Sequence, residues 1–143
     1  MTMELEMEMT QEVIQELMAF LDSSLTSYHA VEGIQNALLQ EGFTALSEKK
    51  RWALEKGGSY FVTRNGSSVL AFRLPNCEIS QIKGFHVYAA HSDSPALKVK
   101  ENPEIDREGV YVSVNIELYG GMTLSTWFDR PLTIAGRVCV EEA

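Results

Sequence analysis

The sequence predicts an α/β fold in which two N-terminal helices pack on a mixed β-sheet. Two observations support this prediction. Apolar residues recur with a period near 3.6 up to Gly42, which is typical of amphipathic helices, and with a period near 2 from Gly57 onward, which is typical of strands. The 143 residues fit one domain, and the 45% apolar and 22% charged fractions are ordinary for a globular protein. Helices that precede a run of strands are expected to cover a face of the sheet.

Both helices are placed by their apolar stripes and end signals. The first is expected over residues 11–21, after a flexible leader over residues 1–10. Its stripe consists of Val13, Ile14, Leu17, Met18, Phe20 and Leu21. The second is expected over residues 28–41, with Ser27 as the N-cap, because a serine hydroxyl accepts a hydrogen bond from an otherwise unpaired backbone N–H. Gly42 follows as a left-handed stop.

The strands are placed by alternation and by turn residues. The stretch "SYFVTRNGSSVLAFRL", residues 59–74, is expected to form a hairpin, because Asn65-Gly66 supplies the two positive φ angles of a type I′ turn. Residues 110–118 alternate between apolar and polar side chains and are expected to form a half-buried strand that Gly120-Gly121 ends. Further strands are expected at residues 85–90, 96–100 and 132–140, with loops at residues 76–83 and 102–109.

Charge and cysteine content exclude several classes of partner. The net charge of −8 argues against nucleic acid and anionic membranes, which proteins bind through clustered Lys and Arg. No apolar run approaches the roughly 20 residues that cross a bilayer, and the N-terminus lacks the basic region of a signal peptide. Cys77 and Cys139 show no CxxC spacing, which indicates a reducing compartment. We therefore expect a cytoplasmic protein.

His91 and Asp93 are the residues most suited to chemistry. Zinc prefers imidazole and carboxylate ligands, and a ligating histidine usually donates its second ring N–H to a carboxylate. Residues two apart in an extended segment point to the same side, so the two side chains can meet at the end of the strand expected over residues 85–90. The HxD pattern alone also fits polar residues that cap an ordinary turn. His29 and His86 are expected to be structural.

Other catalytic patterns are absent from the sequence. No GxSxG elbow or glycine-rich phosphate loop occurs, and Ser92 and Ser94 are not a Ser-His dyad merely because they flank His91. The stretch "YGGMTLSTWFDRPLTIAGRV", residues 119–138, is also unusual. Its two glycines permit a sharp turn or a close backbone approach. Trp127 and Phe128 fit a structured turn with core aromatics, or else a substrate contact.

Taken together, these stretches resemble the aspartyl aminopeptidase family of dinuclear zinc metallopeptidases. The resemblance rests on "AAHSDSPALKVKENPE", "VNIELYGG" and "TWFDRPLTIAGRV", which occur in the family's order and spacing. The upstream "LDSSLTSYHAVEGIQNALLQEGF" resembles the family's opening helices. The resemblance covers residues 11–140, and several long motifs in order are far more specific than one HxD pattern.

The resemblance implies an activity and a site. Members of the family release N-terminal residues, preferably Asp and Glu, from peptides, using water activated by two metal ions, usually zinc. His91 matches the family's first metal ligand. Asp93 matches the catalytic-site residue behind that histidine, which is not itself a ligand. The family is cytoplasmic and assembles as a dodecamer, with a catalytic α/β/α sandwich of the zinc exopeptidase type that is interrupted by an inserted dimerisation domain.

Two departures from the family pattern shape the expectation. Met122 and Leu124 stand where the family often has a third glycine and an aromatic residue. The family's remaining metal ligands and general base find no match, so residues 1–143 are expected to be the N-terminal segment of the catalytic domain, without the inserted domain and the C-terminal segment, and inactive alone. Two alternatives are a non-catalytic oligomerisation or binding module derived from the family, and another co-catalytic zinc exopeptidase or deacylase.

Overall fold

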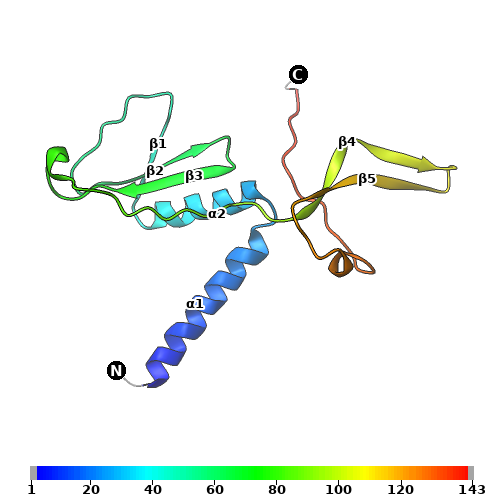
Figure 1. Ribbon diagram of the computed structural model, residues 1–143, viewed down its shortest axis with the longest axis horizontal. Coiled ribbons are helices and arrows are strands. Elements are labelled where there is room, and N and C mark those ends of the chain that lie inside the picture. Colours follow the sequence, from blue (N-terminus) through cyan, green and yellow to red (C-terminus); the bar gives the residue numbers. More distant parts are fainter. Residues whose placement is uncertain (1–2, 142–143) are drawn as a thin grey trace. The chain divides into compact units, whose positions relative to one another are not determined.

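The fold was obtained as a computed structural model that describes residues 3–141 (Figure 1). These residues form two compact units. The first runs up to Asp93 and takes in the segment from Ala135 onward, and the second is Ser94–Ile134. Within the described residues, no helix is both long and apolar enough to cross a membrane.

Helix α1, Met3–Ser23, begins eight residues before the predicted start at residue 11. Glutamate, methionine and leucine are good helix formers, and they make up all of residues 3–9, where the sequence predicts a leader. Residues 1 and 2 of that predicted leader lie outside the described residues. The apolar stripe of α1 is not covered by the described chain: Val13, Leu17 and Leu21 are 62%, 55% and 60% exposed.

Helix α2, Ser27–Gln40, lies close to the predicted range, but its N-cap is Thr26 and not Ser27. Thr26 has the extended backbone of an N-cap, and its hydroxyl accepts from the backbone N–H of His29. The helix ends as predicted at Gly42, whose φ is +78°. The N–H of Phe43 donates to the carbonyl of Leu38 at 2.9 Å, so the last carbonyls are satisfied by a Schellman turn.

The first unit holds a three-stranded mixed sheet of β1 (Thr44–Leu46), β2 (Ser59–Arg64) and β3 (Ser68–Arg73), in that order. β1 is parallel to β2, and β2 is antiparallel to β3. α2 packs on β2 and β3 (Figure 1), and α1 contacts α2 near its own C-terminal end, where Phe20 lies beside Gly33. The predicted α/β fold with two helices and a mixed sheet is confirmed. The three-residue β1 was not predicted, because it is too short to show a period.

The core of the first unit forms where α2 meets β2. Val31 is fully buried, Phe61 is 2% exposed and Tyr60 is 6% exposed. The ring of Tyr60 lies 5.6 Å from that of Phe72, and its hydroxyl accepts from the backbone N–H of Glu55 at 2.8 Å. Tyr60 and Phe61 are consecutive and point to opposite faces of β2, so this strand is buried on both faces.

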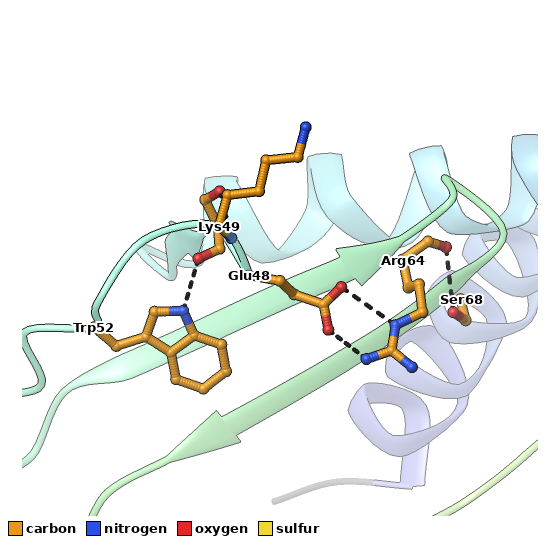
Figure 2. A network of polar contacts seen from close by, with 6 residues as sticks. Glu48, Lys49, Trp52, Arg64 and Ser68 are labelled. Atoms are coloured by element: carbon orange, nitrogen blue, oxygen red, sulfur yellow. Dashed lines mark hydrogen bonds and ion pairs between the residues drawn. The ribbon is translucent and has the colours of Figure 1, made fainter.

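An ion pair joins the loop after β1 to the end of β2 (Figure 2). Arg64 donates from Nη2 to Oε1 of Glu48 at 2.5 Å and from Nε to Oε2 at 3.2 Å. This bidentate hydrogen bond from Arg64 holds the pKa of Glu48 below its ordinary value and raises that of Arg64. Nearby, the Trp52 indole donates to the carbonyl of Ser47 at 2.9 Å. The ion pair holds the loop after β1 against the hairpin, and the Trp52 hydrogen bond closes a turn within that loop.

The second unit is an antiparallel hairpin of β4 (Ala96–Arg107) and β5 (Tyr111–Tyr119). The expected loop over residues 102–109 is wrong, because β4 continues to Arg107 and the turn is confined to residues 108–110, with φ angles of +57° at Glu108 and +72° at Gly109. The register shifts between Val99 and Glu104. Pro103 lies in this irregular stretch, as expected for a residue that cannot donate to a strand ladder.

Two predicted strands are absent from the described residues. Residues 85–90 and 132–140 pair with no strand there, and their apolar side chains stay in solvent: Tyr88 is 95% and Val138 is 88% exposed. The apolar face of β5 is not half-buried as predicted either, since Val112 is 63% exposed. An extended segment becomes a strand only when a partner strand satisfies its backbone. The expected loop at residues 76–83 is found, with a short 3₁₀ turn at Ile79–Gln81.

Candidate functional site

The side chains of His91 and Asp93 meet in the first unit. Nδ1 of His91 lies 3.2 Å from the carboxylate Oδ1 of Asp93 and 2.7 Å from its backbone carbonyl oxygen. The sequence predicts that these two side chains meet, because residues two apart share one side of an extended strand. The structure brings them together in a different way. The chain forms a bend at Ser92, and residues 85–90 directly before His91 are not a strand, so the bend brings the two side chains together.

The surroundings of Nδ1 settle which ring nitrogen of neutral His91 carries the hydrogen. Both groups beside Nδ1, a carboxylate and a carbonyl, only accept hydrogen bonds, so Nδ1 is the donor. Nε2 then carries the lone pair, and the His91 side chain is 79% exposed. An accessible imidazole Nε2, with the other nitrogen held by a carboxylate, is the arrangement that zinc-binding histidines adopt.

Ser92 fixes this bend to the β2–β3 turn. Its hydroxyl donates to the carbonyl of Ser67 at 2.9 Å, across 25 residues of sequence, so it faces the hairpin and does not form a dyad with His91. The turn has the predicted pair of positive φ angles, +53° at Asn65 and +67° at Gly66. The N–H of Ser67 donates to the carbonyl of Arg64 at 3.2 Å and closes it.

Arg137 holds the same turn from another part of the first unit. Nη1 donates to the carbonyl of Asn65 at 2.8 Å, and Nη2 donates to the Asn65 side-chain oxygen at 3.2 Å. The guanidinium also lies over the ring of Tyr28, 4.3 Å from its centroid. Sequence reasoning missed Ser67, Ser92 and Arg137 as parts of the site's surroundings. No local signal points to them, because the partners are 25 and 72 residues apart.

The other candidate ligands do not join His91. Nδ1 of His29 lies 2.8 Å from the hydroxyl of its own N-cap residue, Thr26, which agrees with a structural histidine, and His86 is exposed. Cys77 and Cys139 are free thiols. Among residues 3–141, no three His, Cys, Asp or Glu side chains gather closely enough to hold a metal ion. The residues present therefore fit one zinc ligand position, with its orienting carboxylate, and not a complete metal centre.

The Gly-Gly step in the second unit has a packing role. Gly120 has a φ of +75°, and a Cβ added there would lie 3.3 Å from the Cα of Pro95. This is the close backbone approach that the sequence predicts as one use of the two glycines. Phe128 is 62% exposed and does not belong to the core of the described residues, contrary to the interpretation of Trp127 and Phe128 as core aromatics. Arg130 donates to the carbonyl of Thr126 at 3.1 Å.

An open hollow of about 360 Å³ lies at the irregular part of the β4–β5 hairpin. It is lined by Lys100, Glu101, Asn102, Asn115 and Glu117. The lining has neither histidine nor cysteine and carries charges of both signs, so it offers no soft-metal site and no distinct electrostatic preference.

Comparison with known proteins identifies the family. A model of the family described as aminopeptidase I zinc metalloproteases (M18) matches residues 20–143. The chain belongs to the M18 family of aminopeptidases. The predicted resemblance to aspartyl aminopeptidases is confirmed at this level. The M18 family is described as one of zinc metalloproteases, which agrees with the chemistry of a histidine held by a carboxylate.

Individual M18 relatives support the same assignment. A Clostridium acetobutylicum protein named probable M18 family aminopeptidase 2 is 44% identical over 129 residues, which are 90% of this chain and 30% of that protein. The Ape4 and Nbr1 complex contains a chain with a TM-score of 0.76 and 41% identity, matched over 81% of this chain and 22% of that one. The Saccharomyces cerevisiae mApe1 dodecamer gives a TM-score of 0.75 and 31% identity, over 85% of this chain and 28% of that one.

The chain spans about 30% of the length of the curated relatives it matches. It therefore contains part of the M18 fold. His91 and Asp93 lie within the matched residues 20–143.

Proposed function

We propose that this chain contributes to a metallo-aminopeptidase that releases N-terminal residues, preferably Asp and Glu, from peptides with water activated by two metal ions. The proposal extends the M18 assignment, and the observation that carries it is the meeting of His91 and Asp93 at 3.2 Å, with Nε2 accessible. Zinc is the proposed metal, although other divalent cations suit the same ligands.

His91 and Asp93 have separate proposed roles. Nε2 of His91 is the proposed first metal ligand, and Asp93 is the catalytic-site residue that keeps the ring hydrogen on Nδ1. A negative carboxylate beside Nδ1 also makes Nε2 a stronger donor to a cation. Bound zinc would polarise water and the scissile carbonyl. The described residues supply one ligand position, so we propose that the other ligands come from outside them and that the 143-residue chain alone is inactive.

The proposed setting follows from the family and the composition. One matched relative is a dodecamer, so a homo-oligomer is the proposed assembly. The proposed substrate is a peptide with an acidic N-terminal residue. A net charge of −8 supports the absence of nucleic acid or membrane partners, and the two free thiols support a cytoplasmic location.

Replacement of His91 tests the proposal. We expect His91→Ala in the whole protein to lower kcat/KM for an aspartyl peptide by more than about 100-fold, because loss of a ligand exceeds the roughly 10- to 100-fold effect of losing its hydrogen-bond partner. Asp93→Asn should lower kcat/KM by about 10- to 100-fold, because it removes the hydrogen-bond partner of the ligand and not the ligand itself. His86→Ala is the matched control, since it removes an exposed histidine five residues earlier. Full activity of His91→Ala would refute the assigned role.

One observation favours a second function, that of a non-catalytic assembly module. The apolar stripe of α1 and the apolar face of β5 are both exposed, with Val13 at 62% and Val112 at 63%. Exposed apolar faces of this kind promote association. Sedimentation of the 143-residue chain as a monomer at high concentration would count against this function.

Hydrolysis of acyl-amino acids in place of aspartyl peptides would instead indicate a deacylase.

A further inference from the structure

The side chain of Ser92 connects the bend that carries the candidate site to the β2–β3 turn. The structure forms a bend at Ser92, between His91 and Asp93, and the Ser92 hydroxyl donates to the carbonyl of Ser67 at 2.9 Å. Ser92 is half-buried, whereas the His91 side chain is 79% exposed. One residue of the site thus faces the hairpin while its neighbour faces solvent.

The group that accepts this hydrogen bond is itself fixed. Ser67 closes a turn whose two preceding residues have positive φ angles, and Arg137 binds Asn65 in that turn with two hydrogen bonds. Arg64, where the turn starts, is paired with Glu48. The carbonyl of Ser67 therefore presents a rigid anchor, because both sides of the turn are held by contacts from distant parts of the sequence.

We propose that Ser92 is a positioning residue for His91, acting through the Ser67 carbonyl. Its hydrogen bond holds the bend, the bend keeps Nδ1 of His91 beside the carboxylate and carbonyl of Asp93, and these two acceptors leave the lone pair on Nε2. Without the hydroxyl, the bend gains conformational freedom and the His91 ring samples positions away from Asp93. The metal part of this inference rests on the proposed function, whereas the ring-orientation part does not.

The ring nitrogens of His91 report on the positioning directly. The 143-residue chain has three histidines, so ¹⁵N spectra of the metal-free chain resolve the His91 ring. We expect the Nδ1–H form of the neutral ring to predominate in the natural chain and in Ser92→Thr, which keeps a hydroxyl. In Ser92→Ala we expect a shift toward the Nε2–H form that dominates in free histidine. Ser94→Ala, an exposed serine two residues later, is the matched control and should leave the signals unchanged.

A second measurement tests the consequence for metal binding. In the whole protein, competition between zinc and a chelator should show about tenfold weaker zinc binding for Ser92→Ala, in line with losses of outer-shell partners, and recovery in Ser92→Thr. Ring signals of Ser92→Ala that match those of the natural chain would overturn the proposal, even if zinc binding weakened. A Ser92→Thr variant that behaved like Ser92→Ala would overturn it as well.

The two proposals fail in different ways. If the whole protein binds neither zinc nor another divalent cation, the proposed function is wrong, and the ring signals of the metal-free chain still decide whether Ser92 positions His91. If zinc binds and the Ser92→Ala ring signals are unchanged, the proposed function stands and the positioning role is wrong.

Discussion

Replacing Gly120 with alanine is expected to weaken the pairing of β4 and β5 where the two strands meet the Gly-Gly step. Gly120 has a φ of +75°, and an L-residue in that left-handed region costs about 1–2 kcal/mol. The added Cβ would also lie 3.3 Å from the Cα and 3.4 Å from the Cβ of Pro95, so the Pro95 backbone must move. Alanine restricts the unfolded chain, which offsets about 0.4–1 kcal/mol.

Crowding against a backbone atom counters that offset. We therefore expect the free energy that holds β4 and β5 together to fall by about 1–2 kcal/mol, which is roughly a 5- to 30-fold rise in the equilibrium constant for opening of the strand pair. Native-state hydrogen exchange measures this opening at the strand amides beside the paired residues Ala96 and Tyr119. Gly121→Ala is the matched control, since Gly121 has no positive φ and an added Cβ meets nothing within 4 Å. Equal exchange in the two variants would refute the assignment of strain and crowding to Gly120.

Two further predictions concern the first unit. In Gly58→Ala the new Cβ would lie 2.4 Å from the hydroxyl oxygen of buried Tyr60, so the ring must move. We expect the free energy of unfolding, measured in urea, to fall by about 1–3 kcal/mol. Gly84→Ala is the control and should leave it unchanged, because an added Cβ there meets nothing within 4 Å. Arg64 lowers the folded-state pKa of Glu48, so their pairing stabilises the fold above the ordinary glutamate pKa and loses this effect as pH falls through the lowered value. In Arg64→Met the Glu48 midpoint, followed by ¹³C NMR, should rise, and an unchanged midpoint would contradict this account.

Elements set by local rules were predictable. α2 and the β2–β3 hairpin follow from a 3.6 period, a left-handed glycine and an Asn-Gly turn, each of which acts within a few residues. Even there, the N-cap proved to be Thr26 in place of Ser27, because both residues carry a hydroxyl that can cap a helix and the sequence does not fix which of the two has extended backbone. The prediction of strands at residues 85–90 and 132–140 was wrong for a non-local reason. Apolar residues favour an extended backbone, but a strand also needs a partner strand, which the local sequence does not supply.

The candidate site shows the same division. Sequence spacing predicted that His91 and Asp93 can meet, and the long motifs predicted the family that the comparisons confirm. The prediction attributed the meeting to an extended strand end. In the structure the two residues flank a bend at Ser92, and the Ser92 hydroxyl donates to the carbonyl of Ser67.

The sequence by itself therefore determined the fold class and the family, and it led to the proposal that His91 binds metal and Asp93 orients the His91 ring. Only the tertiary structure decided that the bend carrying these residues lies against the β2–β3 turn, and that Ser92 and Arg137 bind that turn from 25 and 72 residues away. The reason is physical: backbone preferences are encoded over a few neighbouring residues, whereas a hydrogen bond between distant segments exists only after helix and strands have packed and brought them together.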